Sequence, residues 1–253
     1  MYISGLAKEE RVHVYDRFGV ISDRANIFLK SCSIPQDSLI KFDDEFAVEI
    51  VESEWQLKEA YRLRYQTYCV ERGYEASTTG LEIDQFDHRA RHVILRHRRS
   101  GEAAGTVRLV LPDPEAPLNS LPMQRLCEAH HLRSLPFSST AEISRFAVPK
   151  QSRNMAPASA ALMRLGLMRG LLKMSRELNL THWCAVMERS LLRLLQSTAM
   201  HFHPAGPLVE HHGVRQPSYA NIENILARTR REQTAIWDYA TEFGRLASAE
   251  LVS

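Results

Sequence analysis

The chain has 253 residues, 44% of them hydrophobic and 25% charged, which suits one large globular domain with a substantial core. Its formal net charge of +2 is too small to indicate a nucleic-acid partner. The four cysteines are scattered and form no CxxC pair, so the sequence indicates neither a disulfide framework nor a zinc site and favours a reducing cytoplasm.

The first 44 residues, rich in mixed charge, are predicted to form an N-terminal extension that packs on a main domain of residues 45–253. The main domain begins with a strand at 46–51. A helix follows at 53–73, with Ser53 as its N-cap. Two β-rich runs around a Ser-Gly turn at 91–112 predict an antiparallel hairpin.

A further strand is expected at 141–148, "AEISRFAV", before a long helix at 155–178. A strand at 181–187, a helix at 189–200, a strand or strand pair at 202–212 and a helix at 223–243 complete the pattern. Early antiparallel strands followed by strands that alternate with helices predict an α/β fold, with a central mixed sheet flanked by helices. The stretch 155–174 carries three basic residues and the N-terminus lacks a signal-peptide core, so no transmembrane segment is expected.

Acids and arginines stand where apolar residues would serve a sheet protein equally well. Any one of them is typical of a strand end or a solvated loop, but opposite charges about 4 Å apart attract by roughly 4 kcal/mol before desolvation is subtracted. A network of them could therefore tolerate partial burial. The residues are Arg64, Glu82, Asp84, Asp87, Arg108, Glu142 and Arg145.

The segments that carry these charges resemble a known family in order and spacing. "RLRYQTYCVERGYE", "GLEIDQFDHRARHVIL", "GTVRLVLP" and "EISRFAV" are similar to motifs of the acyl-homoserine-lactone synthases and the N-acyl amino acid synthases, a branch of the GNAT acyltransferase fold. "MERSLLRLLQSTAMHFHPAGPLVEHHGVRQPSY" resembles the C-terminal half of the acyltransferases associated with the PEP-CTERM/exosortase system. The resemblance covers about residues 45–220.

The resemblance implies an active-site cluster built from the charged residues. It makes Glu142, Arg145 and Arg108 catalytic. It gives substrate-binding roles to Arg64, Glu82, Asp84 and Asp87. The three arginines, Arg64, Arg108 and Arg145, would hold the acceptor carboxylate or order the acids. The two aspartates would orient the amine and the arginines. Tyr68 and Tyr74 stand where the lactone synthases usually have the Phe and Trp that line the acceptor pocket.

The resemblance also implies a β-bulge in the central strand. One residue inserted between Glu142 and Arg145 would turn both side chains toward one face and leave a backbone N–H free to hold the thioester oxygen. That donor would stabilise the oxyanion of the transition state. Glu142 would then take the proton from the attacking ammonium, or else it pairs with Arg145 or Arg108 to organise the pocket.

The donor implied is an acyl-phosphopantetheine thioester, on acyl carrier protein or coenzyme A, with no tightly bound cofactor. The segment 148–160, "VPKQSRNMAPASA", lacks the glycines with which a helix N-terminus usually cradles a pyrophosphate. Lys150 and Arg153 are predicted to contact a single phosphate there, or else are solvated loop cations. The histidine pairs lack metal-site spacing, so no metal is predicted.

These observations predict a cytoplasmic N-acyltransferase that moves a fatty acyl group from acyl carrier protein to a small, amino-acid-like amine acceptor by direct attack. A coenzyme A-dependent acetyltransferase is the alternative enzyme. A non-catalytic acyl- or lipid-binding sensor, in which the same charges form a structural ion network, is the alternative from another class.

Overall fold

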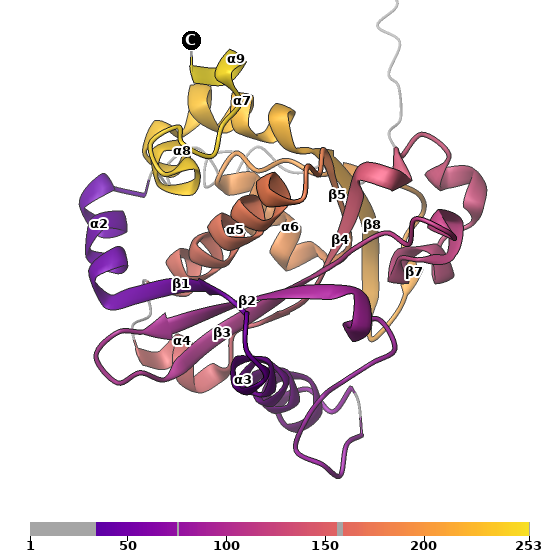
Figure 1. The fold of residues 1–253 in the computed structure, drawn as a ribbon, viewed down its shortest axis with the longest axis horizontal. Coiled ribbons are helices and arrows are strands. Elements are labelled where there is room, and N and C mark those ends of the chain that lie inside the picture. Colours follow the sequence, from indigo (N-terminus) through magenta and orange to yellow (C-terminus); the bar gives the residue numbers. More distant parts are fainter. Residues whose placement is uncertain (1–33, 75, 156–158, 253) are drawn as a thin grey trace, which may run out of the picture. The chain divides into compact units, whose positions relative to one another are not determined.

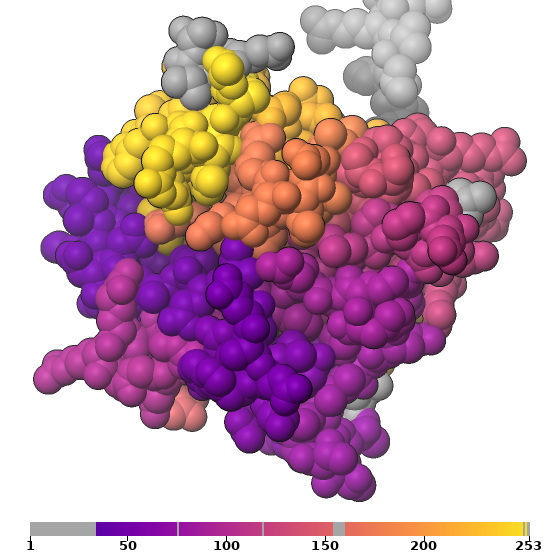
Figure 2. All heavy atoms as spheres, viewed as in Figure 1, coloured from indigo at the N-terminus to yellow at the C-terminus, as the bar shows by residue number. Residues whose placement is uncertain are grey.

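The computed structural model describes residues 34–74, 76–155 and 159–252. Most of the predicted N-terminal extension, residues 1–33, lies outside the described residues. The rest of that predicted extension contains helix α2 (Gln36–Glu45), whose Leu39 and Phe42 are buried in the main hydrophobic core. Phe42 packs edge-on against Tyr239, so the first and last parts of the described chain lie side by side on one face (Figure 2).

One mixed sheet of eight strands organises the protein, in the order β1-β2-β3-β4-β5-β8-β6, with β7 paired to β8 as well (Figure 1). This arrangement confirms the predicted α/β class. Every strand pair is antiparallel except β4 with β5. The strands are β1 (Phe46–Ile50), β2 (Ala90–His97), β3 (Ala103–Val110), β4 (Thr140–Ala147), β5 (His182–Glu188), β6 (His203–Pro204), β7 (Val209–Glu210) and β8 (Val214–Asn221).

Helices cover both faces of this sheet. Figure 1 shows α3 on the face opposite α5, with α2, α7 and α8 on the α5 side. The α-helices besides α2 are α3 (Glu54–Arg64), α4 (Lys150–Met155), α5 (Ser159–Glu177), α6 (Arg189–Ser197), α7 (Ile222–Glu232), α8 (Thr234–Thr241) and α9 (Ala249–Val252).

The main core forms where the apolar face of α5 lies on the sheet. Met163, Leu167 and Leu171 of α5 are fully buried there. A Cβ added at Gly170 would come within 2.5 Å of Val93, so glycine lets the helix approach β2 closely. Because α5 connects the parallel strands β4 and β5, its packing also sets how these two strands lie beside each other.

Helix α3 begins as predicted, since the Ser53 side chain accepts from the N–H of Gln56 in a capping box. After Arg64 the helix does not continue as an α-helix to residue 73. Residues Tyr65–Glu71 widen into a π-helix, a rare element that is often found at functional sites. The hydrophobic periodicity of the sequence does not distinguish the two helix types.

The C-terminal half contains the largest departures from the sequence prediction. The strand pair expected at 202–212 consists only of the two-residue strands β6 and β7, and their principal partner, β8, was not predicted. Pro217 argues against a strand because it has no N–H. It is tolerated here because β6 pairs with Tyr219 and Ser218 while β7 pairs with Arg215 and Val214, which leaves a gap opposite Pro217.

The helix expected at 155–178 corresponds to α5, described from Ser159 to Glu177, while Met155 is the last described residue of α4. Another predicted helix is divided. The helix expected at 223–243 breaks at Gln233, whose φ and ψ of −146° and 64° are not helical, and forms α7 and α8. The hydrophobic pattern continues across this break because both helices pack on the same core.

Candidate active site

A cleft opens where the parallel strands β4 and β5 separate. They pair only at Thr140–Glu142 with His182–Cys184. Between the described residues 143–147 and 185–188 there is no ladder pairing, so the strands diverge toward these ends. Two cavities meet along this opening and share six lining residues: Tyr68, Ile143, Ser144, Arg145, Val186 and Arg215.

The predicted β-bulge is present in β4, but one step further along the strand than expected. Ser144 pairs with Arg108 and Ala147 pairs with Thr106, so Arg145 and Phe146 together stand opposite Val107. Arg145 has a φ of 51°, in the left-handed region that costs a non-glycine residue about 1 kcal/mol or more. The extra residue therefore lies after Ser144, and the bulge reaches the edge of the cleft.

Three arginines and three acids form a closed ring of alternating charge beside the bulge. Each arginine contacts two acids, and each acid contacts two arginines. In order around the ring they are Arg64, Glu82, Arg145, Asp84, Arg108 and Asp87.

Arg64 is the most enclosed member of the ring, with none of its side chain exposed. Its Nε donates to Glu82 at 2.5 Å, and its two terminal nitrogens donate to both oxygens of Asp87 at 2.6 and 3.0 Å. Burial alone would raise the pKa of Asp87, but the hydrogen bonds and positive charge of Arg64, together with Arg108, lower that pKa well below its usual value.

Arg108 and Arg145 close the ring on the cleft side. Arg108 donates from one terminal nitrogen to Asp84 at 2.6 Å and to Asp87 at 2.9 Å, while its Nε donates to Ser144 at 3.0 Å. Arg145 lies 2.9 Å from Glu82 and 3.0 Å from Asp84. Asp84 and Arg145 are the ring members with the most exposed side chains, 22% and 21%. Both line one of the two cavities, here called the charged cavity, which also contains Glu142.

Glu142 stands apart from this ring although it faces the same cavity. It is 2% exposed, and its Oε2 accepts a hydrogen bond from the N–H of Met123 at 2.6 Å. Among the described residues no ion pair within 4.0 Å joins it to an arginine, and its predicted roles as base or as a structural partner stay predictions. Burial raises the pKa of Glu142 to about 8, against the opposing effects of the Met123 N–H and the charges of the two arginines.

The charged cavity, of about 340 Å³, contains Glu142 and the cleft side of the ring. Tyr74 lies on its wall and stacks on His212, with ring centroids 4.7 Å apart and planes 15° apart. Phe86 and Arg125 form another part of the wall. The cavity thus combines two carboxyl groups, Asp84 and Glu142, with aromatic and cationic surfaces.

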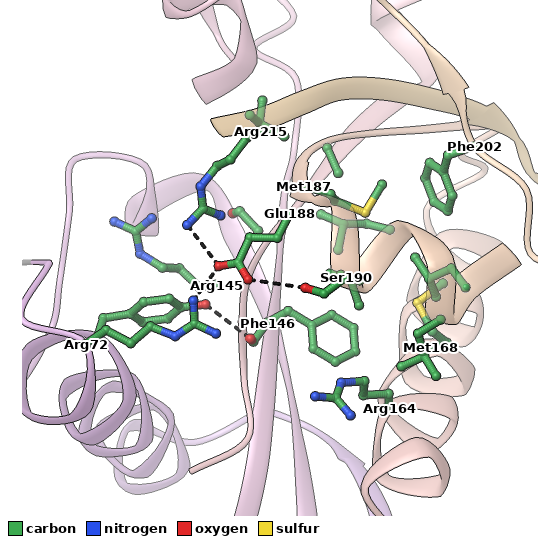
Figure 3. Close-up of a pocket in the computed structure, with 18 residues that line it drawn as sticks. Arg72, Arg145, Phe146, Arg164, Met168, Met187, Glu188, Ser190, Phe202 and Arg215 are labelled. Carbon is green, nitrogen blue, oxygen red and sulfur yellow. Dashed lines mark hydrogen bonds and ion pairs between the residues drawn. The ribbon is translucent and has the colours of Figure 1, made fainter. Parts of the chain in front are cut away.

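The second cavity, of about 310 Å³, has a largely apolar inner wall. Figure 3 shows Met168 and Phe202 on the side of α5 and α6, with Arg164 of α5 close to Met168 and with Met187 between Phe202 and Glu188, whereas Arg72, Glu188 and Arg215 gather at the other end. The apolar lining is completed by Ile143, Phe146, Ala185, Val186, Leu191, Leu194 and Leu195. An alkyl chain fits this inner wall, and a polar group fits the outer end.

An ion cluster ties together the two sides of the cleft at that outer end. Arg72, from the end of the π-helix, and Arg215, from β8, both contact the same oxygen of Glu188 on β5 (Figure 3). Arg215 also donates from Nε to the carbonyl oxygen of His211 at 2.5 Å. The cluster therefore holds the turn before β8 against the end of the π-helix.

Tyr68 connects the π-helix to the bulge. Its hydroxyl donates to the carbonyl oxygen of Phe146 at 3.1 Å, and the guanidinium of Arg145 lies 5.6 Å from its ring centroid. Both bulge residues are thus contacted by one side chain. Because Tyr68 lines both cavities, it stands at the point where they join.

Lys150 and Arg153 lie outside both cavities. The backbone N–H of Lys150 donates to Glu71 at 2.8 Å, and Arg153 lies 3.5 Å from the other oxygen of Glu71. The side chain of Lys150 is exposed. Their predicted phosphate contact stays a prediction, because the residues that follow α4 lie outside the described part of the chain.

The sequence analysis missed several residues of the cleft. No role was predicted for Arg72, Glu188 or Arg125. Glu188 and Arg215 both lie within the C-terminal segment that was quoted for its resemblance to a family, and no role in the site was assigned to either. Arg72 was within the quoted motif "RLRYQTYCVERGYE", and this was the one signal that could have identified it.

Two general findings limit the kinds of site present. Within residues 34–74, 76–155 and 159–252, no group of three or more histidine, cysteine or acidic side chains is arranged to hold a metal ion. None of the helices in this part of the chain is long and apolar enough to cross a membrane.

Comparison with known proteins agrees with this architecture. Residues 63–163 match the model of the acetyltransferase (GNAT) domain, and these residues contain the ring, the bulge and Glu142. No curated protein matches the sequence.

Solved structures with the same fold are distant in sequence. The N-acyl amino acid synthase FeeM from uncultured soil microbes is 18% identical, with a TM-score of 0.56 over 75% of this chain and 97% of that one. The acyl-homoserine-lactone synthase LasI is 19% identical, with a TM-score of 0.55 over 73% and 92%. BjaI, described as a CoA-dependent acyl-homoserine lactone synthase with SAM and isopentyl-CoA, is 18% identical, with a TM-score of 0.58 over 82% and 92%. The protein therefore has the GNAT fold.

Proposed function

We propose that this acyltransferase of the GNAT fold moves a fatty acyl group from an acyl carrier protein thioester to the amine of an amino-acid-like acceptor, giving an N-acyl amino acid or an autoinducer-like product. The observation that carries the proposal is the cleft between β4 and β5, where a cavity with an apolar inner wall meets a second cavity that contains Asp84 and Glu142. The apolar inner wall suits the acyl chain, and the carboxyl groups of the second cavity suit an amine.

The reaction needs no covalent enzyme intermediate. The acceptor nitrogen attacks the thioester carbonyl carbon, a C–N bond forms, and the carbonyl oxygen becomes an oxyanion. Backbone N–H groups of the bulge at Arg145–Phe146 are suited to stabilise that oxyanion. Collapse of the intermediate breaks the C–S bond, and the sulfur leaves as the thiolate of the carrier. The nitrogen loses its second proton as the amide forms, and the thiolate takes up that proton directly or through solvent.

Glu142 is the proposed general base for the proton that the ammonium must lose. It lines the charged cavity, and burial raises its pKa to about 8. A general base works best when its pKa is near the working pH, because part of it is then deprotonated and the deprotonated form is still basic enough to accept a proton. Its buried side chain accepts from the Met123 N–H through Oε2, and within the described part of the chain no hydrogen bond engages Oε1, which could contact the acceptor directly or through water.

The remaining assignments rest on sequence resemblance and on these contacts. Lys150 and Arg153 would meet the phosphate of the phosphopantetheine arm. The resemblance of the C-terminal half to the PEP-CTERM/exosortase-associated acyltransferases supports membership of that group, and the free thiols of Cys127 and Cys184 support a cytoplasmic location. Coenzyme A is the alternative carrier of the acyl group, as the description of BjaI indicates for that protein.

Purified protein tests the proposal directly. It is mixed with fatty acyl thioesters of acyl carrier protein or of coenzyme A, with and without a pool of amino acids. Free thiol released only when acceptor is present, together with an N-acyl product in the mass spectrum, supports the proposal, and the preferred thioester identifies the donor. Tight thioester binding without turnover would instead identify a sensor.

A further inference from the structure

The three arginines expected to hold the acceptor carboxylate are already occupied. Arg64 is fully buried and contacts Glu82 and Asp87 with all three of its nitrogens. The guanidinium groups of Arg108 and Arg145 each contact two acids. The ring has equal numbers of positive and negative charges, so an incoming carboxylate would have to displace one of the ring's own acids.

A different arginine faces the same cavity without such partners. Arg125 is exposed and lines the charged cavity, and its guanidinium lies over the ring of Phe86 at 4.7 Å from the centroid. Among the described residues no carboxylate lies within 4.0 Å of it. Stacking on an aromatic face leaves the edge of a guanidinium, which carries its N–H donors, available for a planar anion.

The turn that carries Arg125 is held in place by several contacts. Arg125 ends the 3₁₀ helix Pro122–Arg125, in which the Gln124 side chain accepts from the Leu121 N–H at 2.8 Å and donates to the Pro117 carbonyl at 2.8 Å. Leu121 and Met123 are buried in a second hydrophobic cluster. The backbone from which the Arg125 side chain extends is therefore already ordered, so a ligand does not have to order it.

The same short turn also holds the proposed base. The N–H of Met123, two residues before Arg125, donates to Glu142. Asp84 lines the cavity as well. The cavity thus presents carboxyl groups that suit an ammonium and a guanidinium that suits a carboxylate.

We propose that Arg125 binds the carboxylate of the acceptor, and that the acceptor is a small amino acid with a free carboxylate rather than an uncharged amine. This inference rests on the proposed function. The acceptor's nitrogen then lies toward Glu142 and Asp84 while its carboxylate receives two N–H bonds from Arg125. A cavity of about 340 Å³ is at the small end of the range for small-molecule sites, which suits a single amino acid.

Kinetics with matched acceptors test the assignment. The wild type and the variants Arg125→Gln and Arg125→Lys are compared on the best of the twenty common amino acids and on the primary amide of that amino acid. Arg133→Gln, at an exposed arginine a few residues further along the same segment, is the control. We expect Arg125→Gln to raise KM for the amino acid roughly 10- to 100-fold, to leave KM for the amide unchanged, and to leave kcat nearly unchanged. Arg125→Lys should restore part of the affinity.

Two results would overturn the inference. One is an equal rise of KM for the amino acid and its amide in Arg125→Gln; the other is a wild type that uses the amide as well as the free acid. Binding without turnover is measured separately, by calorimetric titration of the same amino acids into the protein in the absence of donor. If acyl transfer is never observed but Arg125→Gln abolishes amino acid binding, the proposed function fails and the assignment of Arg125 stands. The assignment of Arg125 also fails if no amino acid binds or reacts with the wild type.

Discussion

The charge ring and Glu142 face the same cavity, yet the pKa values of Asp84 and Asp87 in the ring are shifted in the opposite direction from that of Glu142. In the ring, arginine partners keep the pKa values of Asp84 and Asp87 below normal although burial alone would raise them. Glu142 has a backbone N–H instead of an arginine at hydrogen-bonding distance, and burial raises its pKa to about 8. Burial therefore does not decide the charge of these acids; the nearest partner does.

This contrast assigns the two regions different tasks. The ring holds α3, the loop of residues 82–87, β3 and β4 together through ion pairs that would be costly to break singly. Glu142 is the carboxyl group that can exchange a proton near neutral pH. The following predictions test that division.

The largest expected effect is that of Glu142→Gln on the rate. Loss of a general base typically lowers kcat by about 10²- to 10⁴-fold. Glutamine keeps an oxygen that can accept from the Met123 N–H, so the melting temperature should not fall. Steady-state thiol release and thermal unfolding measure the two quantities, with Glu115→Gln at an exposed position as the control.

The pH profile of the wild type provides a check on the same residue. Because the base must be deprotonated, kcat should rise from pH 6 and level off above the pKa of about 8. A Glu142→Gln variant with wild-type activity, or with the same inflection, would contradict the assignment.

Arg64→Met should cause the largest loss of stability. It leaves the buried carboxylates of Glu82 and Asp87 without one partner each, and breaking a buried ion pair in this way typically costs 3–5 kcal/mol, so we expect a loss of about 3–5 kcal/mol in the free energy of unfolding. Chemical denaturation measures this loss, and Arg62→Met, at an exposed position of the same helix, is the matched control. A loss no greater than that of the control would show that the ring does not stabilise the fold.

The two regions should also respond oppositely to pH. The folded pKa of Glu142 lies above its ordinary value of 4.5, so its contribution to stability is present below pH 4.5 and is lost as the pH rises toward 8. Glu142→Gln should therefore gain stability over the wild type across this interval, by roughly 4 kcal/mol at its upper end. Asp84 and Asp87 of the ring have lowered pKa values, so their contribution is lost as the pH falls below about 4.

Denaturation of both proteins at pH 5 and pH 8 measures this difference. A constant difference in unfolding free energy between Glu142→Gln and the wild type at the two pH values would contradict the raised pKa of Glu142.

The smallest expected effect is that of Tyr68→Phe. It removes the hydrogen bond to the Phe146 carbonyl at 3.1 Å, which typically contributes about 1 kcal/mol, and so loosens the bulge without touching the ring. We expect kcat to fall severalfold with little change in KM or in melting temperature. Tyr65→Phe in the same π-helix is the control, and an equal effect of both substitutions would show that the contact with the bulge is unimportant.

Much of the architecture could be predicted because it depends on local patterns. The Ser53 cap, the hairpin of β2 and β3 and the strand β4 follow from residue spacing and turn chemistry, and all three are present. The strand β8 could not be predicted in the same way, because Pro217 is compatible with a strand only when the neighbouring strand is interrupted opposite it.

In the candidate site, too, the identity of the residues could be predicted from the sequence, but their partners could not. The sequence identified the seven charged residues, but ion pairs between residues as distant as Glu82 and Arg145 depend on how the loop and the strands come together. It gave no indication that Glu142 would be left out of the ring, or that Arg125 would face the same cavity.

The sequence by itself determined the order of β1 to β5 and of the helices that lie between them, the apolar faces that build the core, and the presence of balanced charges near the centre of the sheet. The tertiary structure decided where β4 and β5 separate, which side chain occupies the extra position of the bulge, and which carboxyl group is buried without an arginine partner. Periodicity and capping act over a few residues, whereas the pKa and accessibility of a side chain depend on every group packed around it, including groups far away in the chain.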